Sequence, residues 1–210
     1  MNFKKKNKNT ERILIFLFVL VIGCFTVIPY FYSIKNIRNS ILRLHVLANS
    51  DTEEDQTIKL AVRDKVLEYG EDIFTEVSSK NSKINAKSFL SRNLSDIKNI
   101  ANNVVSQYGE NYEIEVSVEN KYFNTRVYDD VTLPAGLYDS LVIRIGEAKG
   151  QNWWCVMFPP MCLPAATETV ELSEVLSDEQ LHIITDDTNY TVKFAVVEVI
   201  EEFTHKSYEE

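Results

Sequence analysis

The spacing of apolar and polar residues changes along the chain and predicts a strand, two helices and then a series of strands. Apolar and polar residues alternate in Ile41–Leu47, which is typical of a strand. Apolar residues recur every three or four positions over 58–69 and over 90–108, which is the period of a helix that packs by one face. Further alternating segments predict strands at Tyr112–Val118, Tyr122–Tyr128, Leu137–Ile145, Trp153–Phe158 and Tyr190–Val199. This order favours a single α+β domain, with two helices packed on a mostly antiparallel sheet.

An uncharged run at positions 13–34 precedes this domain. Its 22 residues are enough for a spanning helix, which needs about 20 apolar residues. Five basic residues within 1–12 favour keeping that end in the cytoplasm. We therefore expect a basic cytoplasmic segment (1–12), a transmembrane anchor or signal peptide (13–34) and an exported domain (35–210). Two alternatives to an uncleaved anchor stay open: a cleaved signal peptide, and a lipoprotein in which Cys24 accepts the lipid.

The composition is that of an ordinary globular protein, and the charge argues against one class of partner. The chain has 210 residues, of which 45% are hydrophobic and 25% charged, so it can bury a core. The net charge is −9, but residues 1–12 contribute +4 and residues 13–34 nothing, which leaves −13 on the exported part. Because nucleic-acid binding needs a basic surface, we exclude DNA and RNA as partners.

Export changes how two of the three cysteines are interpreted. Cys155 and Cys162 have six residues between them, among which are Pro159-Pro160. Outside the cytoplasm such a pair can form a disulfide across a tight turn. Two buried free cysteines that act as small apolar side chains are the alternative. The spacing is too wide for a CxxC redox centre, and no second cluster supports a zinc site.

Catalytic motifs are not recognisable in the sequence. We find no phosphate loop, dinucleotide fingerprint, metalloprotease helix or nucleophile elbow. None of the three histidines has a second His or Cys at ligand spacing. Cys155, His45 and Asn49 have the residue types of a thiol triad, but nothing in the sequence brings them together and a disulfide at Cys155 would block it. We therefore expect no enzymatic activity, no cofactor and no metal.

The densest group of polar residues lies where the first strand meets the first helix. Alternation puts Arg43 and His45 on the solvent-facing side of the strand. Asn49 and Asp51 follow in a run of helix-capping residues. Because strand-to-helix junctions are favoured binding positions, these four residues are candidates for contact with a partner. A capped helix beside a solvated strand explains the same residues without any ligand.

A second candidate contact is the pair Trp153-Trp154. Neighbouring residues of a strand point to opposite faces, so one of the two tryptophans should face outward. An exposed tryptophan beside Pro159-Pro160 suits a protein–protein contact. Paired tryptophans also line carbohydrate grooves, so a role in binding cell-wall sugars stays open.

Two long blocks of the sequence resemble the stage II sporulation protein R family. The first block runs from Arg43 to Asp64 and begins RLHVLANSD. The second runs from Leu133 to Cys162 and contains GQNWWCVMFPPMC. The likeness covers residues from about 40 to 164 and returns weakly in Val192–Val199.

The resemblance implies a signalling role in endospore formation. Members of this family are made in the forespore and exported into the space between forespore and mother cell, either anchored to the membrane or secreted. There they trigger a membrane-embedded aspartic protease of the mother cell, the stage II sporulation protein GA, which processes the sigma-E precursor. The family has no established enzymatic activity, so no catalytic residue is carried over. The alternative is an exported enzyme or glycan-binding module that acts on the cell wall.

Overall fold

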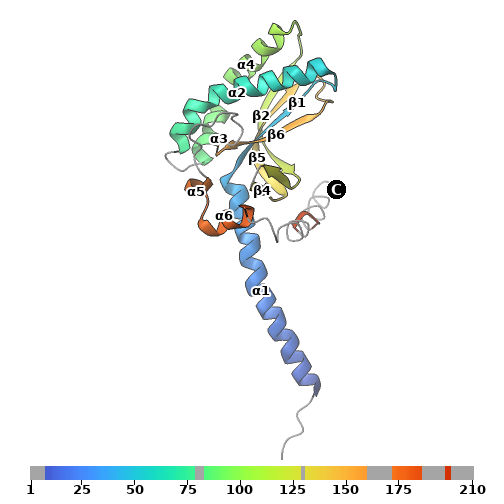
Figure 1. The fold of residues 1–210 in the computed structure, drawn as a ribbon, viewed down its shortest axis with the longest axis vertical. Helices are drawn as coiled ribbons and strands as arrows, with labels where there is room; N and C mark the ends of the chain where they lie inside the picture. The colour runs from blue at the N-terminus through green and yellow to red at the C-terminus, as the bar shows by residue number, and fades with distance from the viewer. Residues whose placement is uncertain (1–7, 79–82, 129–130, 160–171, 186–196, 200–210) are drawn as a thin grey trace, which may run out of the picture. The chain divides into compact units, whose positions relative to one another are not determined.

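The computed structural model describes residues 8–78, 83–128, 131–159, 172–185 and 197–199 (Figure 1). The chain forms two compact units, Met1–Asn36 and Ile37–Glu210. The first unit contains most of helix α1 (Lys8–Ser40), which has 33 residues. No helix in the part of the chain that the structure describes combines the length and the apolar character of a membrane crossing.

The second unit is built on a four-stranded sheet in the order β2-β5-β1-β6 (Figure 1). Its strands are β1 (Leu42–Leu47), β2 (Ile114–Phe123), β5 (Gly136–Ile145) and β6 (Asn152–Phe158). Strand β1 pairs with β5 in parallel, whereas the β1–β6 and β2–β5 pairs are antiparallel. A separate hairpin pairs β3 (Arg126–Tyr128) with β4 (Val131–Leu133). The predicted α+β domain with a mostly antiparallel sheet is therefore confirmed.

Three helices pack on one face of this sheet and form the main core with it (Figure 1). They are α2 (Glu53–Ser78), α3 (Lys83–Arg92) and α4 (Leu94–Gln107). The short helices α5 (Leu172–Val175) and α6 (Asp178–Thr185) follow the sheet in the chain. Leu44 of β1, Ile58 of α2 and Ile143 of β5 are fully buried members of this core. Alternation in the strands and the helical period in the helices both direct apolar side chains to this layer.

The structure corrects three details of the predicted elements. The second predicted helix is two helices. At the break, the side-chain amide of Asn93 donates to the Phe89 carbonyl oxygen (2.8 Å) and so competes with the backbone hydrogen bonds of the helix. Strand β2 runs without interruption through Asn120-Lys121, which the alternating pattern places between two strands. Of the predicted strand Tyr190–Val199, residues 190–196 lie outside the described residues and 197–199 are helical.

Candidate functional site

Strand β1 is buried on both faces, which corrects the predicted position of its polar residues. Arg43 is 0% exposed and His45 is 1% exposed, so the prediction that this pair faces solvent is wrong. The physical reason is that β1 lies between β5 and β6, where neighbouring strands supply aromatic side chains to the face opposite the helices. Alternation here separates an apolar buried face from a polar buried face, not core from solvent.

The guanidinium of Arg43 lies in an aromatic cage formed by Phe123, Tyr128 and Tyr138. Its Cζ atom is 4.0 Å from the ring centre of Phe123, 5.1 Å from that of Tyr138 and 5.6 Å from that of Tyr128. Nη2 donates a hydrogen bond to the Tyr128 hydroxyl oxygen. Burial lowers the pKa of Arg43, and the nearby tyrosines oppose that shift. The faces of the rings stabilise the buried cation by cation–π attraction.

Several polar atoms beside this cage have no partner among the residues that the structure describes. There, Nε and Nη1 of Arg43 donate no hydrogen bond. Ser140, which is the β5 neighbour of Arg43 in the parallel register, is fully buried and its hydroxyl is also unpartnered. A buried donor without an acceptor costs roughly 1–3 kcal/mol. The Arg43–Ser140 cluster (the Arg43 guanidinium and the Ser140 hydroxyl) therefore has unused capacity to bind an acceptor.

His45 lies two residues further along the same face of β1 and stacks on Trp154. The two ring centres are 3.8 Å apart and the ring planes differ by 10°. Nε2 of His45 lies 3.1 Å from the Asn152 side-chain oxygen, an acceptor, so we place the imidazole proton on Nε2. Burial lowers the pKa of His45 to about 4, against the opposing effect of the Asn152 hydrogen bond. His45 is therefore neutral at neutral pH.

The residues of the imagined thiol triad do not come together. Cys155 is the register neighbour of Leu44 and belongs to the core under the helices, whereas His45 faces the other side of the sheet. Cys155 is also disulfide-bonded. Cys162, its predicted partner, lies outside the described residues, so the Cys155–Cys162 pairing stays a prediction.

The other two junction residues, Asn49 and Asp51, join two loops that are far apart in sequence. The Asn49 side-chain oxygen accepts a hydrogen bond from the Glu147 amide (2.9 Å), and an Asp51 carboxylate oxygen accepts one from the Gln151 amide (2.7 Å). The Gly150 amide donates to the Ala48 carbonyl oxygen (3.0 Å). We call this set of contacts the loop latch; it connects the β1–α2 loop to the β5–β6 loop.

Asp55 holds the β1–α2 side of the loop latch in place from the first turn of α2. Its carboxylate accepts hydrogen bonds from the Asn49 amide (2.9 Å) and the Ser50 hydroxyl, and the Tyr112 hydroxyl is a further partner. Burial raises the pKa of Asp55, but these hydrogen bonds lower it more, so that the net shift is downward. The Asp55 amide in turn donates to the Thr52 hydroxyl (3.3 Å), which caps α2. Asn49 thus has a structural role, and its contact with a partner stays a prediction.

The two tryptophans point to opposite faces of β6. Trp153 is 36% exposed, and the Arg63 guanidinium of α2 lies 4.2 Å from its ring centre. Trp154 is half-buried between His45 and Phe123. Trp153 is therefore the more exposed member of the pair, although it shares the helix-facing side of β6 with the core residue Cys155.

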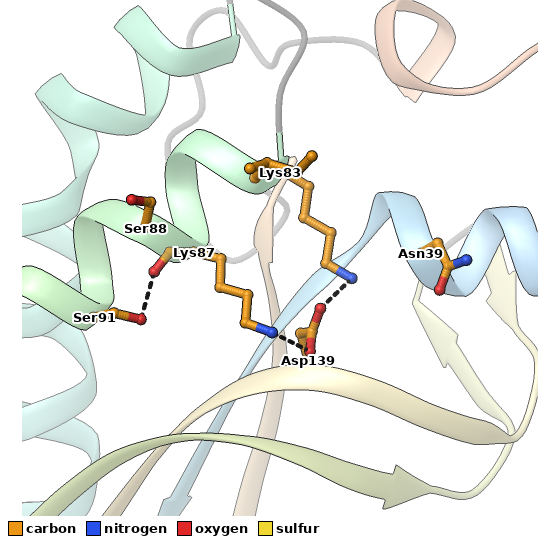
Figure 2. A pocket seen from close by; sticks show the side chains of 7 residues that line it. Asn39, Lys83, Lys87, Ser88, Ser91 and Asp139 are labelled. Carbon is orange, nitrogen blue, oxygen red and sulfur yellow. Dashed lines mark hydrogen bonds and ion pairs between the residues drawn. The ribbon is translucent and has the colours of Figure 1, made fainter.

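A polar cleft on α3 was not found by sequence reasoning. Figure 2 shows Lys83 and Lys87 reaching from α3 to Asp139 of β5, with ammonium–carboxylate distances of 2.9 and 2.8 Å. The cleft has a volume of about 520 Å³, and Asn39 and Ser88 also line it. Burial raises the pKa of Asp139, but the two lysines outweigh this effect, so that the pKa falls to about 2. The two lysines are four residues apart, but nothing in the sequence connects them to Asp139.

Metal ligands are not assembled in the described part of the chain. No group of three or more His, Cys, Asp or Glu side chains there could hold a metal ion. The acidic residues with assigned partners, such as Asp55 and Asp139, bind donors of the protein itself. What the described geometry offers is a buried cation in an aromatic cage, a loop latch and a small basic cleft.

Fold and site together define a class of protein: a small α+β domain in which the β1–α2 loop is hydrogen-bonded to the β5–β6 loop and β1 carries a buried arginine. The family model described as Stage II sporulation protein R matches residues 38–168. Stage II sporulation protein R of Bacillus subtilis (strain 168) is 33% identical over 162 residues, which cover 74% of this chain and 71% of that relative. The chain belongs to the stage II sporulation protein R family. No solved structure matches it.

Proposed function

We propose that this protein is an exported signal of endospore formation that activates the membrane-embedded aspartic protease, stage II sporulation protein GA, by direct contact. The protease then processes the sigma-E precursor. The observation that carries the proposal is the family match over residues 38–168, which covers the sheet and the helices packed on it. In this proposal catalysis belongs to the protease, which agrees with the placement of His45 and Cys155 on opposite faces of the sheet.

Export and membrane attachment are part of this proposal. The apolar side chains of residues 13–21 are 47–66% exposed in the first unit, which is a surface that needs an apolar environment or a translocation partner. The basic residues of 1–12 favour the cytoplasm for that end. A disulfide-bonded Cys155 supports an oxidising compartment for the second unit, since structural disulfides are rare in the cytosol.

The six candidate contact residues divide by exposure. Asp51 and Trp153 are exposed and can touch a protein partner as they stand. Asn49 and Trp154 are half-buried, whereas Arg43 and His45 are buried. We propose that the first contact uses the edge of the sheet around Trp153, because exposed tryptophans are frequent hot spots of protein interfaces.

Co-expression of three proteins tests the proposed function. The full chain, the protease and the sigma precursor are produced together in a host without sporulation genes, and precursor cleavage is followed by immunoblot. We expect processed sigma factor only when all three proteins are present, with omission of the chain as the control. Absence of processing with all three proteins present at comparable levels contradicts the proposal.

A cell-wall role is the second candidate, favoured by the exposed ring of Trp153. Sugar rings stack on exposed tryptophans, although Arg63 already covers part of this one. The test is retention of the full chain on purified peptidoglycan and release of soluble fragments from it. Retention that is lost in Trp153→Ala supports this role. The absence of both retention and hydrolysis excludes it.

A further inference from the structure

The Arg43–Ser140 cluster is a set of buried donors that point to a missing acceptor. Within the described part of the chain, Nε and Nη1 of Arg43 and the hydroxyl of Ser140 have no hydrogen-bond partner, and both residues are 0% exposed. They occupy neighbouring positions of two paired strands and therefore share one face of the sheet. Protein interiors rarely leave such groups unpaired, and an unpaired group often marks a binding position for water, an ion or a ligand.

The charge of the cluster selects the chemistry of that acceptor. Among the described residues no carboxylate contacts the Arg43 guanidinium, whose only hydrogen-bond partner is the neutral Tyr128 hydroxyl. Arg126 adds a second positive charge nearby, which further disfavours the cation. An uncompensated buried charge is strongly destabilising, and cation–π contact with the rings offsets only part of that cost. An anion would compensate the rest.

A carboxylate is the anion that fits this geometry. Its two oxygens match two parallel N–H groups of a guanidinium in bidentate pairs. Ser140 lies beside Arg43 on the adjacent strand, and its hydroxyl is a further buried donor on the same face of the sheet. The rings of Phe123 and Tyr138 contact the guanidinium without accepting from its Nε and Nη1 groups, which stay available to a carboxylate.

The β3–β4 hairpin is placed to cover this position. It pairs only three residues with three and is separate from the main sheet. Tyr128 at the end of β3 reaches Arg43 and occupies Nη2, while Val127 beside it is 70% exposed. Strand β3 has no buried residue, whereas Val131 and Leu133 anchor β4, so release of β3 costs less free energy than opening of the core. Tyr128 thus holds the place that an acidic group would take.

We propose that the Arg43–Ser140 cluster is a carboxylate-binding site closed by the β3–β4 hairpin, and that an aspartate or glutamate side chain of the activated protease displaces Tyr128 from Arg43. The second half rests on the proposed function; the carboxylate site itself does not. In this arrangement Arg43 becomes a partner contact only after the hairpin opens, although it is buried in the free protein.

Acetate is the probe for the site itself. The thermal unfolding midpoint of the full chain is measured in increasing sodium acetate against sodium chloride of equal ionic strength. We expect a saturable stabilisation in acetate, an apparent Kd several-fold lower in Tyr128→Phe because the competing hydroxyl is removed, and several-fold higher in Ser140→Ala. Tyr69→Phe is the matched control, because its hydroxyl reaches only the exposed Asp96 on the helical layer.

The outcomes separate this proposal from a purely structural cage. If Tyr128 has only a structural role, Tyr128→Phe lowers the thermal unfolding midpoint and leaves its dependence on acetate unchanged. That result overturns the proposal. Equal acetate dependence in the wild type and Ser140→Ala overturns it as well. Arg43→Met should abolish the acetate effect; should that variant not fold, Ser140→Ala and Tyr128→Phe still decide.

Co-expression then tests the protease half. Tyr128→Phe should process the sigma precursor at least as fast as the wild type, and Ser140→Ala more slowly. Acetate binding without any processing contradicts the proposed function and leaves the carboxylate site intact. Processing without acetate binding contradicts the site and leaves the function intact. Acetate binding with equal processing by all variants overturns the role of the site in contacting the protease.

Discussion

At the residue scale, Arg43 and His45 show what alternation predicts and what it leaves open. Alternation correctly separates them from Leu44, which packs under the helices. It does not reveal that Phe123 and Trp154 cover the second face, since those residues lie at least 78 positions further along the chain. A polar side chain on a strand is therefore compatible with burial wherever another strand supplies a cover.

Stability at mildly acidic pH tests the burial of His45. Its pKa is about 4 in the folded protein and about 6.5 in an unfolded chain, so the unfolded state binds the proton more readily between these values. The contribution to stability is complete above about pH 6.5 and is lost as the pH falls towards 4. We expect the free energy of unfolding to fall by about 2 kcal/mol between about pH 7 and about pH 5 on account of His45.

Urea denaturation at several pH values measures this loss. His45→Gln cannot titrate and should show a flatter pH dependence over that range. His182→Gln, which changes an exposed histidine of α6, should keep the wild-type slope. Equal slopes for the wild type and His45→Gln would contradict the assignment.

At the element scale, the periods in the sequence predicted most helices and strands, but not how their connections meet. The loop latch joins Asn49 to Glu147 and Asp51 to Gln151, across 98 and 100 residues of sequence. The capping residues after β1 were recognisable from their types. Their partners are backbone amides, which carry no sequence signal. The close approach explains why glycine stands at positions 146 and 150.

Gly150→Ala tests the loop latch. A Cβ atom at this position would lie 2.1 Å from the Ser50 carbonyl oxygen, which is backbone and cannot rotate away. We expect a loss of about 2–3 kcal/mol in the free energy of unfolding, since overpacking forces the two loops apart. Gly109→Ala is the control: its φ is +81° but nothing lies within 4 Å, so only the backbone strain of about 1–2 kcal/mol applies. Equal or smaller losses in Gly150→Ala would contradict the close packing.

At the scale of the whole molecule, the uneven charge and the disulfide at Cys155 both support the proposed export. An acidic body behind a basic, then uncharged, N-terminal segment is the charge pattern on which that proposal rests. Cys155 is disulfide-bonded and 4% exposed within the core. A bridge that is anchored in the core should stabilise the domain as a whole.

Reduction tests the contribution of that bridge. We expect a reductant to lower the unfolding midpoint of the wild type, and Cys155→Ser to lose about 2–4 kcal/mol in the free energy of unfolding and all sensitivity to reductant. Cys24→Ser should behave as the wild type if Cys162 is the partner. Labelling of the native protein that detects free thiols at both Cys155 and Cys162 would rule the predicted bridge out.

The sequence by itself determined the α+β class, the approximate helices and strands, and the family, because periodicity and motif blocks are local properties of the chain. Tertiary structure decided that Arg43 is caged, that Asn49 and Asp51 bind the β5–β6 loop, and that Asp139 meets two lysines. Each of these depends on strand order, which brings distant residues together. Burial and pairing follow from that order, and so does the chemistry available to a partner.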